Sequence, residues 1–180
     1  DEFLFDKDRD GVKDSVDLCP DQYGSINAYG CPDVDNDGIP NDFDLCPTLH
    51  GKIELQGCPE ITQFEKNILV KALEDLKFDF DKAEINYSSY PTLTDITLLL
   101  LKNPKMFLHI TGYSSSEGSV EYNLGLSARR AKAVQNFFTG RGIKKSRLIL
   151  DYLGEEAPLN NNENENEKAQ NRREEFSLEY

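Results

Sequence analysis

GYSSSEGSVEYNLGLSARRAKAV, residues 112–134, begins at the end of an apolar segment, crosses a loop rich in serine and glycine, and continues with apolar residues at helical spacing. The pattern predicts a strand over residues 106–113 and a long helix over residues 121–139, which stops at Gly140. A strand that leads through a polar loop into a helix is a building unit of layered α/β folds. The stretch therefore predicts an α/β domain around it.

The sequence on both sides continues this alternation of helices and strands. Apolar residues recur at helical spacing before the stretch, whereas Phe78 and Phe80 alternate with charged residues, as in a strand. A loop rich in asparagine and glutamate at residues 158–167 is expected to turn helical before Arg172. The fold class is therefore α/β, with helices packed on a small mixed sheet. The other predicted helices are residues 65–76 and 89–102, and the other predicted strands are residues 77–81, 147–153 and 175–180.

The first 59 residues differ in composition from the rest of the chain. They contain 14 acidic and 4 basic residues, a net charge of −10, whereas residues 60–180 contain 19 acidic and 16 basic residues, a net charge of −3. Residues 6–32 and 33–59 are two tandem repeats of 27 residues that match at 13 positions without a gap. This division predicts a repeat segment over residues 1–59 and a separate domain over residues 60–180.

Each repeat opens with aspartates at alternate positions, then a glycine, a hydrophobic residue and two further oxygen-bearing side chains. Counted from the first aspartate, the ligand positions are 1, 3, 5, 7, 9 and 12, with glycine at position 6, as in an EF-hand calcium loop. Calcium takes roughly six to eight oxygen ligands at flexible distances, and this pattern supplies oxygens of the right kind. We expect calcium as the cofactor, with one ion per repeat. The expected ligands are Asp6, Asp8, Asp10, Val12, Asp14 and Asp17 in the first repeat and Asp33, Asp35, Asp37, Ile39, Asn41 and Asp44 in the second.

The expected calcium sites serve structure. No amphipathic helices flank the loops, so calcium has no helix pair to open as it does in a sensor. The clustered carboxylates repel one another without a cation, and we therefore expect the segment to be loose without calcium and compact with it. The alternative is a solvated acidic linker, which the strict repeat and the two glycines at position 6 disfavour.

All four cysteines lie in the repeats, at Cys19, Cys31, Cys46 and Cys58. An even number at regular spacing in a small acidic segment predicts disulfides and an oxidising compartment. Because each repeat carries one pair, we expect pairing within repeats, although three connectivities are open to four cysteines. Zinc binding is the alternative, but it uses CxxC pairs or nearby histidines, and each cysteine here precedes a proline without a close cysteine partner.

Composition and motifs also argue against several classes of function. A net charge of −13 argues against nucleic acid as a partner, since phosphate binding needs a basic face. The longest apolar run, at residues 96–101, is too short to span a membrane. No nucleophile–base pair, phosphate-binding glycine loop or histidine cluster is visible in the sequence, so we expect no enzymatic activity.

The pattern DxDxDGxxDxxDxCP in the repeats is similar to the thrombospondin type 3 repeat. Residues 6–20 match it throughout, and residues 33–47 depart from it only at Asn41, beside which Asp42 adds an acid. The resemblance implies rigid, calcium-bound spacers. We therefore expect an irregular N-terminal segment that is calcium-bound and stapled by disulfides.

Three strings in the second part resemble the OmpA-like C-terminal domain: FDFDKAEI at residues 78–85, GYSSSEGSVEYNLGLSARRAKAV at residues 112–134, and NRREEF at residues 171–176. The resemblance covers residues 64–180. It implies non-covalent binding of peptidoglycan through meso-diaminopimelate of the stem peptide, on the periplasmic face of the bacterial outer membrane. Type 3 repeats before such a domain are typical of outer-membrane proteins with an N-terminal β-barrel, which would precede Asp1.

The ligand of that family carries an ammonium and a carboxylate side by side. The resemblance implies that an Asp in the family string GHTDxxG binds the ammonium and an Arg in LSxxRA binds the carboxylate. Arg130 provides the Arg, whereas uncharged Ser115 stands at the position of the Asp. Glu117 in the same loop could supply a substitute carboxylate. The expected ligand-binding residues are Ser115, Glu117, Asn123, Arg130, Arg172 and Arg173.

Two functions remain open after this comparison. In the first, the domain anchors the outer membrane to peptidoglycan and the repeats form a calcium-stiffened spacer, which Arg130, Arg173 and Asn123 favour. In the second, which Ser115 favours, the pocket is degenerate and the chain is a calcium-dependent structural, adhesion or protein-interaction module that can form a homodimer. We expect the first.

Overall fold

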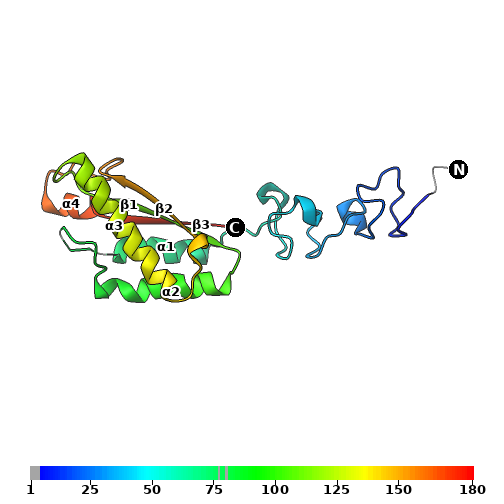
Figure 1. Ribbon diagram of the computed structural model, residues 1–180, viewed down its shortest axis with the longest axis horizontal. Coiled ribbons are helices and arrows are strands. Elements are labelled where there is room, and N and C mark those ends of the chain that lie inside the picture. The colour runs from blue at the N-terminus through cyan, green and yellow to red at the C-terminus, as the bar shows by residue number, and fades with distance from the viewer. Residues whose placement is uncertain (1–4, 77, 80) are drawn as a thin grey trace. The chain divides into compact units, whose positions relative to one another are not determined.

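The fold is described from a computed structural model, which describes residues 5–76, 78–79 and 81–180 (Figure 1). The chain forms two compact units, of which the first runs up to Glu60 and the second comprises Ile61–Glu179. Among the described residues, no helix has the length and apolar character needed to cross a membrane.

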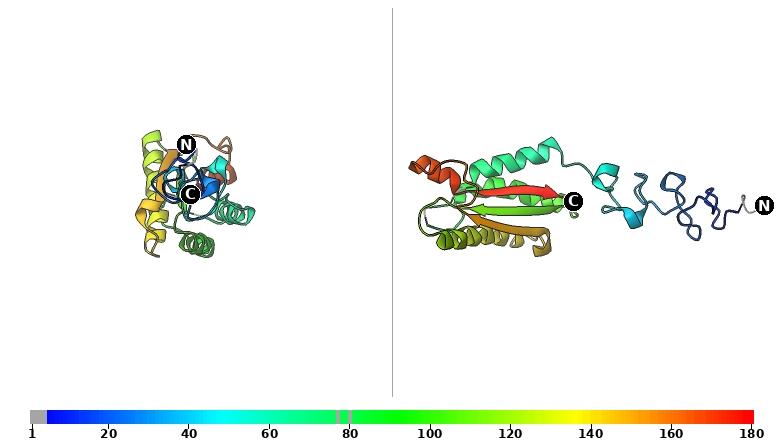
Figure 2. Two further views of the ribbon diagram at one scale, coloured as in Figure 1. Left: turned by 90° about the vertical axis from the view of Figure 1, so that its right-hand side faces the viewer. Right: turned by 90° about the horizontal axis from the view of Figure 1, so that it is seen from above.

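The second unit is built on a three-stranded mixed sheet (Figure 2). Its strands are β1 (Phe107–Tyr113), β2 (Leu148–Gly154) and β3 (Glu174–Glu179), in the order β2-β1-β3. The central strand β1 pairs in parallel with β2 and antiparallel with β3. The predicted small mixed sheet is therefore confirmed.

Helices α1 (Gln63–Asp75) and α3 (Val120–Thr139), which accompany the sheet, each begin at a capping side chain. The Thr62 hydroxyl accepts a hydrogen bond from the Glu65 amide while the Glu65 carboxylate accepts one from the Thr62 amide, a capping box that starts α1. Ser119 caps α3 by accepting a hydrogen bond from the Tyr122 amide. The α-helices of the described residues are α1 (Gln63–Asp75), α2 (Tyr90–Lys102), α3 (Val120–Thr139) and α4 (Glu165–Asn171).

One face of the sheet is buried under α3. Leu108 and Ile110 of β1 are fully buried and share their face with Gly112, where a Cβ atom would lie 2.6 Å from the Ser127 carbonyl oxygen of α3. Val134 in the apolar stripe of α3 is also fully buried. Helix α1 packs against β3 and α2, so the hydrophobic core lies between the helices and this face.

The predicted helices and strands are confirmed with ends shifted by one or two residues, apart from one segment. The predicted strand at residues 77–81 falls partly on Lys77 and Phe80, which lie outside the described residues. Of its other residues, Phe78 forms a single antiparallel bridge with Ile85. The Asp79 carbonyl within this segment and the Lys82 carbonyl just after it accept hydrogen bonds from the side chain of Arg130.

The first unit is irregular, and its described residues contain short 3-10 helices and isolated bridges but no α-helix. Disulfides join Cys19 to Cys31 and Cys46 to Cys58, which confirms pairing within repeats and excludes zinc as their partner. An antiparallel bridge to the second cysteine of each pair adds backbone hydrogen bonds beside the sulfur atoms. Covalent links thus take the place of regular structure.

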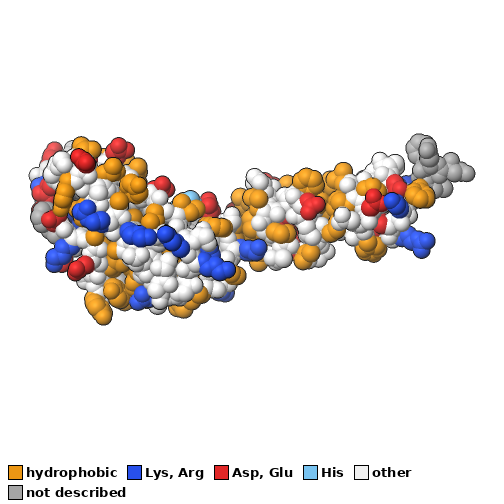
Figure 3. Space-filling model, viewed as in Figure 1, with side chains coloured by type: hydrophobic (Ala, Val, Ile, Leu, Met, Phe, Trp, Pro, Cys, Tyr) orange, Lys and Arg blue, Asp and Glu red, His pale blue; other side chains and the backbone are white. Residues whose placement is uncertain are grey.

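The first unit also buries few hydrophobic side chains. Val12 and Ala28 are buried together with three of the cysteines, whereas Phe43 and Ile53 are largely exposed. Figure 3 shows hydrophobic side chains across the visible surface of this part of the chain. A core this small stabilises a fold weakly, so staples are needed to hold the repeats in one conformation.

Candidate functional site

The aspartates that open each repeat lie close together. The carboxylate of Asp6 shapes the first loop, since its two oxygens accept hydrogen bonds from the backbone amides of Arg9 (2.7 Å) and Gly11 (3.1 Å). Asp33 makes the equivalent bonds in the second repeat. The bent loop brings carboxylate oxygens close together, and oxygens are the ligands that a hard cation binds. Two clusters result, and within each the three carboxylates have one oxygen apiece within 4.8 Å of one another. The first cluster is Asp6, Asp8 and Asp10, and the second is Asp33, Asp35 and Asp37.

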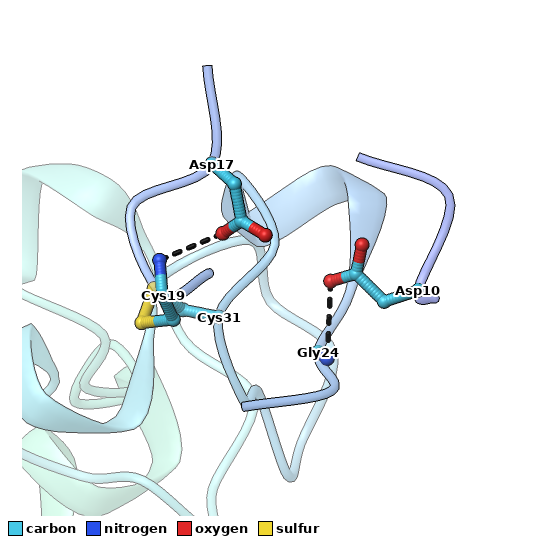
Figure 4. The surroundings of a disulfide bond; sticks show 5 residues. All are labelled: Asp10, Asp17, Cys19, Gly24 and Cys31. Atoms are coloured by element: carbon cyan, nitrogen blue, oxygen red, sulfur yellow. Dashed lines mark hydrogen bonds between the residues drawn. A yellow bond between two sulfur atoms is a disulfide. The ribbon is translucent and has the colours of Figure 1, made fainter. Parts of the chain in front are cut away.

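The aspartate at position 12 of each repeat is buried, and Figure 4 shows the one of the first repeat, Asp17, beside Cys19. Asp17 is 9% exposed and Asp44 is 8% exposed. One oxygen of each accepts a hydrogen bond from the amide of the first disulfide cysteine, at 2.7 Å for Cys19 and 2.6 Å for Cys46. The other oxygen, Oδ2, is buried without a hydrogen-bond partner among the described residues. Because a buried unpaired carboxylate oxygen is unfavourable, these donors fit a divalent cation such as calcium.

The clustered carboxylates also act on one another electrostatically. Burial raises the pKa of the Asp8 carboxyl above its ordinary value, and neighbouring aspartates of the same repeat raise it further. Burial also raises the pKa of Asp44; the Cys46 amide opposes this shift, and the other aspartates of its repeat add to it. Asp8 and Asp35 each carry a buried Oδ2 without a partner among the described residues. A bound cation would relieve both the repulsion and the unpaired oxygens.

Position 9 of each repeat has a structural partner. The Asp14 side chain accepts a hydrogen bond from the Lys7 amide at 2.8 Å, and the Asn41 side chain accepts one from the Val34 amide at 3.0 Å. An amide oxygen and a carboxylate oxygen can both accept this bond, which explains why asparagine substitutes for aspartate here. The backbone amides of the two position-7 residues, Val12 and Ile39, donate to the position-5 carboxylates.

The second unit buries an arginine whose hydrogen bonding is incomplete. Arg130 of α3 is 0% exposed, and its Nε donates to the Lys82 carbonyl at 2.9 Å while its Nη2 donates to the Asp79 carbonyl at 3.3 Å. The guanidinium carbon lies 5.0 Å from the centre of the Phe78 ring. Its Nη1 has no hydrogen-bond partner among the described residues. Burial lowers the pKa of Arg130 to about 10, against the opposing effect of the Glu174 charge.

A buried glutamate acts on the same guanidinium. Glu174, the first residue of β3, is 1% exposed, and neither of its carboxylate oxygens has a hydrogen-bond partner among the described residues. Burial raises the pKa of Glu174 well above its ordinary value, and the charge of Arg130 opposes this shift. Gly112 lies opposite Glu174 in the sheet, and a Cβ atom there would lie 3.0 Å from Glu174 Oε2. The absence of a side chain at Gly112 makes room for this carboxylate.

Ser115 and Asn123, which are also expected at the pocket, are buried as well. Ser115 is 5% exposed, and the adjacent Ser114 donates its amide to the Gly154 carbonyl at 2.6 Å, which fixes the loop to the end of β2. The Asn123 side-chain amide donates to Glu155 at 2.5 Å. Asn123 thus already has a partner within the chain, in the loop after β2.

The three remaining candidates, Glu117, Arg172 and Arg173, form ion pairs, and Arg173 is itself buried. Glu117 lies 3.0 Å from Lys168 and 3.5 Å from Arg172, which also pairs with a glutamate of α4. Arg173 donates from Nε to Glu175 at 2.7 Å, and its guanidinium carbon lies 3.7 Å from the centre of the Tyr113 ring. These pairs hold α4 and the loop before α3, and they leave the Glu117 carboxylate neutralised by two cations.

Residues 77–172 match the family model described as the OmpA family. The chain belongs to the OmpA family. Outer membrane porin F of Pseudomonas aeruginosa is 31% identical over 177 residues, which cover 97% of this chain and 41% of that protein. The peptidoglycan-associated lipoprotein of the same organism is 31% identical over 104 residues, 58% of this chain and 61% of that one. The chain therefore spans less than two thirds of these relatives.

A solved structure shows the same fold for the OmpA-family domain. The peptidoglycan-associated lipoprotein from Burkholderia pseudomallei superposes with a TM-score of 0.56 at 29% identity, covering 58% of this chain and 88% of that structure. The family match includes Arg130, Ser115 and Asn123 but ends before Glu174.

Glu174 is the residue of this OmpA-family domain that the sequence analysis missed. The available signal is the alternation within the last strand, because Glu174 has the same parity as the apolar residues Phe176 and Leu178. Phe176 pairs with Ile110 and Leu178 pairs with Leu108 across the sheet, so this face is the buried one. An acid at the start of a strand on its buried face is a candidate for function.

Proposed function

We propose that this OmpA-family domain anchors the bacterial outer membrane to peptidoglycan without a covalent bond, on the periplasmic side. Relatives named as an outer membrane porin and as a peptidoglycan-associated lipoprotein support the partner and the compartment. The proposed ligand is the peptidoglycan stem peptide, bound through the free end of meso-diaminopimelate. This end carries an ammonium and a carboxylate and therefore needs one anionic and one cationic partner.

The observation that carries this proposal is the unpaired nitrogen of Arg130. Two nitrogens of its guanidinium are fixed by backbone carbonyls, while Nη1 is buried and unpaired among the described residues. A guanidinium held in this way is positioned in advance to donate to a carboxylate, and burial strengthens the interaction. Asn123, and more remotely Arg172 and Arg173, support the loops around it.

We further propose that the repeats bind calcium and form a stiff spacer, as thrombospondin type 3 repeats do. The support is the set of buried carboxylate oxygens without partners at Asp8 and Asp17, with their counterparts Asp35 and Asp44. Calcium would supply the positive charge that these oxygens lack. The Val12 and Ile39 carbonyls are proposed as further ligands, whereas Asp14 and Asn41 also shape the loop.

Co-sedimentation of the whole chain with purified peptidoglycan sacculi tests the anchor. The substitution Arg130→Lys keeps the charge but removes the fork of donors, and we expect it to abolish pelleting. Arg129→Lys is the matched control, because Arg129 is the exposed neighbour on the same helix and should pellet as the native chain does. Equal pelleting of the native chain and Arg130→Lys would contradict the proposed pocket.

The second candidate function is a calcium-dependent structural, adhesion or interaction module with an inactive pocket, for which a second copy of the chain is one possible partner. The observation that favours it is the uncharged, buried Ser115 in the family's acidic position. A native chain that fails to pellet, while Ser115→Asp restores pelleting, would support this candidate and contradict the anchor.

A further inference from the structure

We propose that Glu174 binds the ammonium group of the stem peptide, in place of the acid that is missing at Ser115. This inference rests on the proposed peptidoglycan anchor and names the anionic half of its pocket. The carboxylate comes from β3 instead of the loop after β1, so the two charged partners of the ligand would be Arg130 and Glu174.

The position of Glu174 in the sheet supports this assignment. Glu174 pairs with Gly112 at the end of β1, three residues before Ser115. Glu174 therefore lies at the same end of the sheet as Ser115, the position at which the family has its Asp. Because Gly112 has no side chain, the Glu174 carboxylate can lie against β1 on the face that α3 covers, the same helix that carries Arg130.

The hydrogen bonding of Glu174 and Arg130 is incomplete in a complementary way. Both oxygens of Glu174 and Nη1 of Arg130 are buried and lack hydrogen-bond partners among the described residues. The charge of each affects the pKa of the other, yet no hydrogen bond joins the two side chains among the described residues. A direct ion pair would satisfy both groups, so the structure does not favour a Glu174 that simply neutralises Arg130.

A ligand with both charges would complete this arrangement. Its ammonium has donors for the two Glu174 oxygens, and its carboxylate has acceptors for Arg130 Nη1. The site would then hold two charges of each sign, which favours a zwitterionic end over a purely cationic or anionic one. Both side chains are buried, and the carbonyls of Asp79 and Lys82 hold the other nitrogens of Arg130.

Calorimetric titration of the whole chain with two peptides tests the assignment. One is a stem tripeptide that ends in diaminopimelate, and the other is the same tripeptide with the free side-chain amine acetylated. We expect the native chain to bind the acetylated peptide about 30-fold or more weakly, because one partner of a buried charge pair is lost. Glu174→Gln should bind both peptides with the same affinity, as weakly as the native chain binds the acetylated peptide. Glu174→Asp keeps the negative charge and should retain part of the preference for the free amine.

Thermal unfolding of each variant establishes that it is folded. The control Glu175→Gln, at the next residue of β3, should keep the full preference for the free-amine peptide. A Glu174→Gln chain that still prefers the free amine would overturn the assignment while leaving the anchor intact. Tighter binding by Glu174→Gln would also overturn it, since Glu174 would then compete with the ligand for Arg130. Absence of binding by the native chain would overturn the anchor and this assignment together.

Discussion

Gly112 of β1 and Glu174 of β3 lie directly opposite each other, and a Cβ atom at Gly112 would lie 3.0 Å from Glu174 Oε2 and 2.6 Å from the Ser127 carbonyl oxygen. The second of these contacts is with the backbone of α3, which cannot move without shifting the helix. The glycine therefore permits two features at once: a buried carboxylate and a close approach of α3 to the sheet.

Replacing Gly112 with alanine should destabilise the second unit. The new methyl group would overlap the Ser127 carbonyl, so α3 must move away from the sheet, and we expect the free energy of unfolding to fall by about 1–3 kcal/mol. Urea unfolding followed by circular dichroism measures this change.

Gly125→Ala provides the matched control on α3. A Cβ atom there meets only the end of the flexible Arg129 side chain, at 3.3 Å. Alanine also favours the helix over glycine, by about 0.5–1 kcal/mol. The two glycine-to-alanine changes should therefore have opposite signs. A neutral Gly112→Ala would show that the close approach of α3 does not contribute to stability.

Glu174 should make the stability of the domain depend on pH. Burial raises its folded-state pKa well above the unfolded value, with Arg130 opposing, so the folded chain holds a proton that the unfolded chain releases. The contribution of Glu174 to the stability of the domain is complete below the pKa of the carboxyl in the unfolded chain, near 4.5. It is lost as pH rises through the pKa of the same carboxyl in the folded chain.

Glu174→Gln removes this titration and isolates its effect. As pH rises from about 4, the native chain should lose stability relative to Glu174→Gln, by at most about 1.4 kcal/mol per pH unit. Urea unfolding at several pH values and constant calcium measures the difference, in which the titration of the other carboxylates largely cancels. A difference that does not change with pH would contradict a raised pKa for Glu174.

Most of the fold could be predicted from the sequence because local and long-range signals agree. The loop before α3 carries a helix cap at Ser119, and the apolar stripe of α3 follows at helical spacing. The strand around Leu108 alternates, as a half-buried sheet requires. Around Phe78 the same alternation corresponds, among the described residues, to a single bridge with Ile85, and the carbonyls of Asp79 and Lys82 accept hydrogen bonds from Arg130.

The candidate site was harder to predict than the fold. Acidic positions in the repeats follow a fixed spacing, so the carboxylate clusters at Asp6 and Asp33 could be predicted from the sequence alone. Glu174 is distant from Arg130 in sequence and reaches it only through the pairing of β3 with β1. Glu117 is the substitute acid that the loop sequence suggests, but Lys168 and Arg172, both distant in sequence, pair with it in the structure.

Removal of calcium should loosen the first unit and leave the second folded. The proposed ions are held by carboxylates that repel one another without them, so binding energy is folding energy for the repeats. Calcium at about 100 times its dissociation constant would add about 2.7 kcal/mol to the stability of a site. Hydrogen exchange with and without a chelator should show loss of protection in residues 5–60 and none in α3.

Asp44→Asn and Asp42→Asn form a matched pair for the second repeat. Asp44 has a buried oxygen without a partner among the described residues, whereas Asp42 is exposed. We expect calorimetry to show weaker calcium binding in the second repeat for Asp44→Asn and nearly native binding for Asp42→Asn. Equal effects of the two changes would indicate diffuse attraction to an acidic surface and not a site.

Loss of one disulfide should weaken calcium binding in its own repeat. Asp44 accepts a hydrogen bond from the Cys46 amide and packs so closely against Gly57 that a Cβ atom there would overlap its carboxylate. The disulfide between Cys46 and Cys58 holds these two segments together. Its removal should destabilise the repeat by about 3 kcal/mol and free the Asp44 carboxylate from its position.

The double substitution Cys46→Ser with Cys58→Ser tests this coupling, and Cys19→Ser with Cys31→Ser is its counterpart in the first repeat. In a calcium titration by calorimetry, each double variant should retain one site of native affinity and weaken the other. Combining each double variant with Asp44→Asn shows which site is weakened. Asp44→Asn should cause little further loss of calcium affinity where the disulfide of the second repeat is already missing. If both double variants kept two native sites, the disulfides would stabilise the repeats without positioning the ligands.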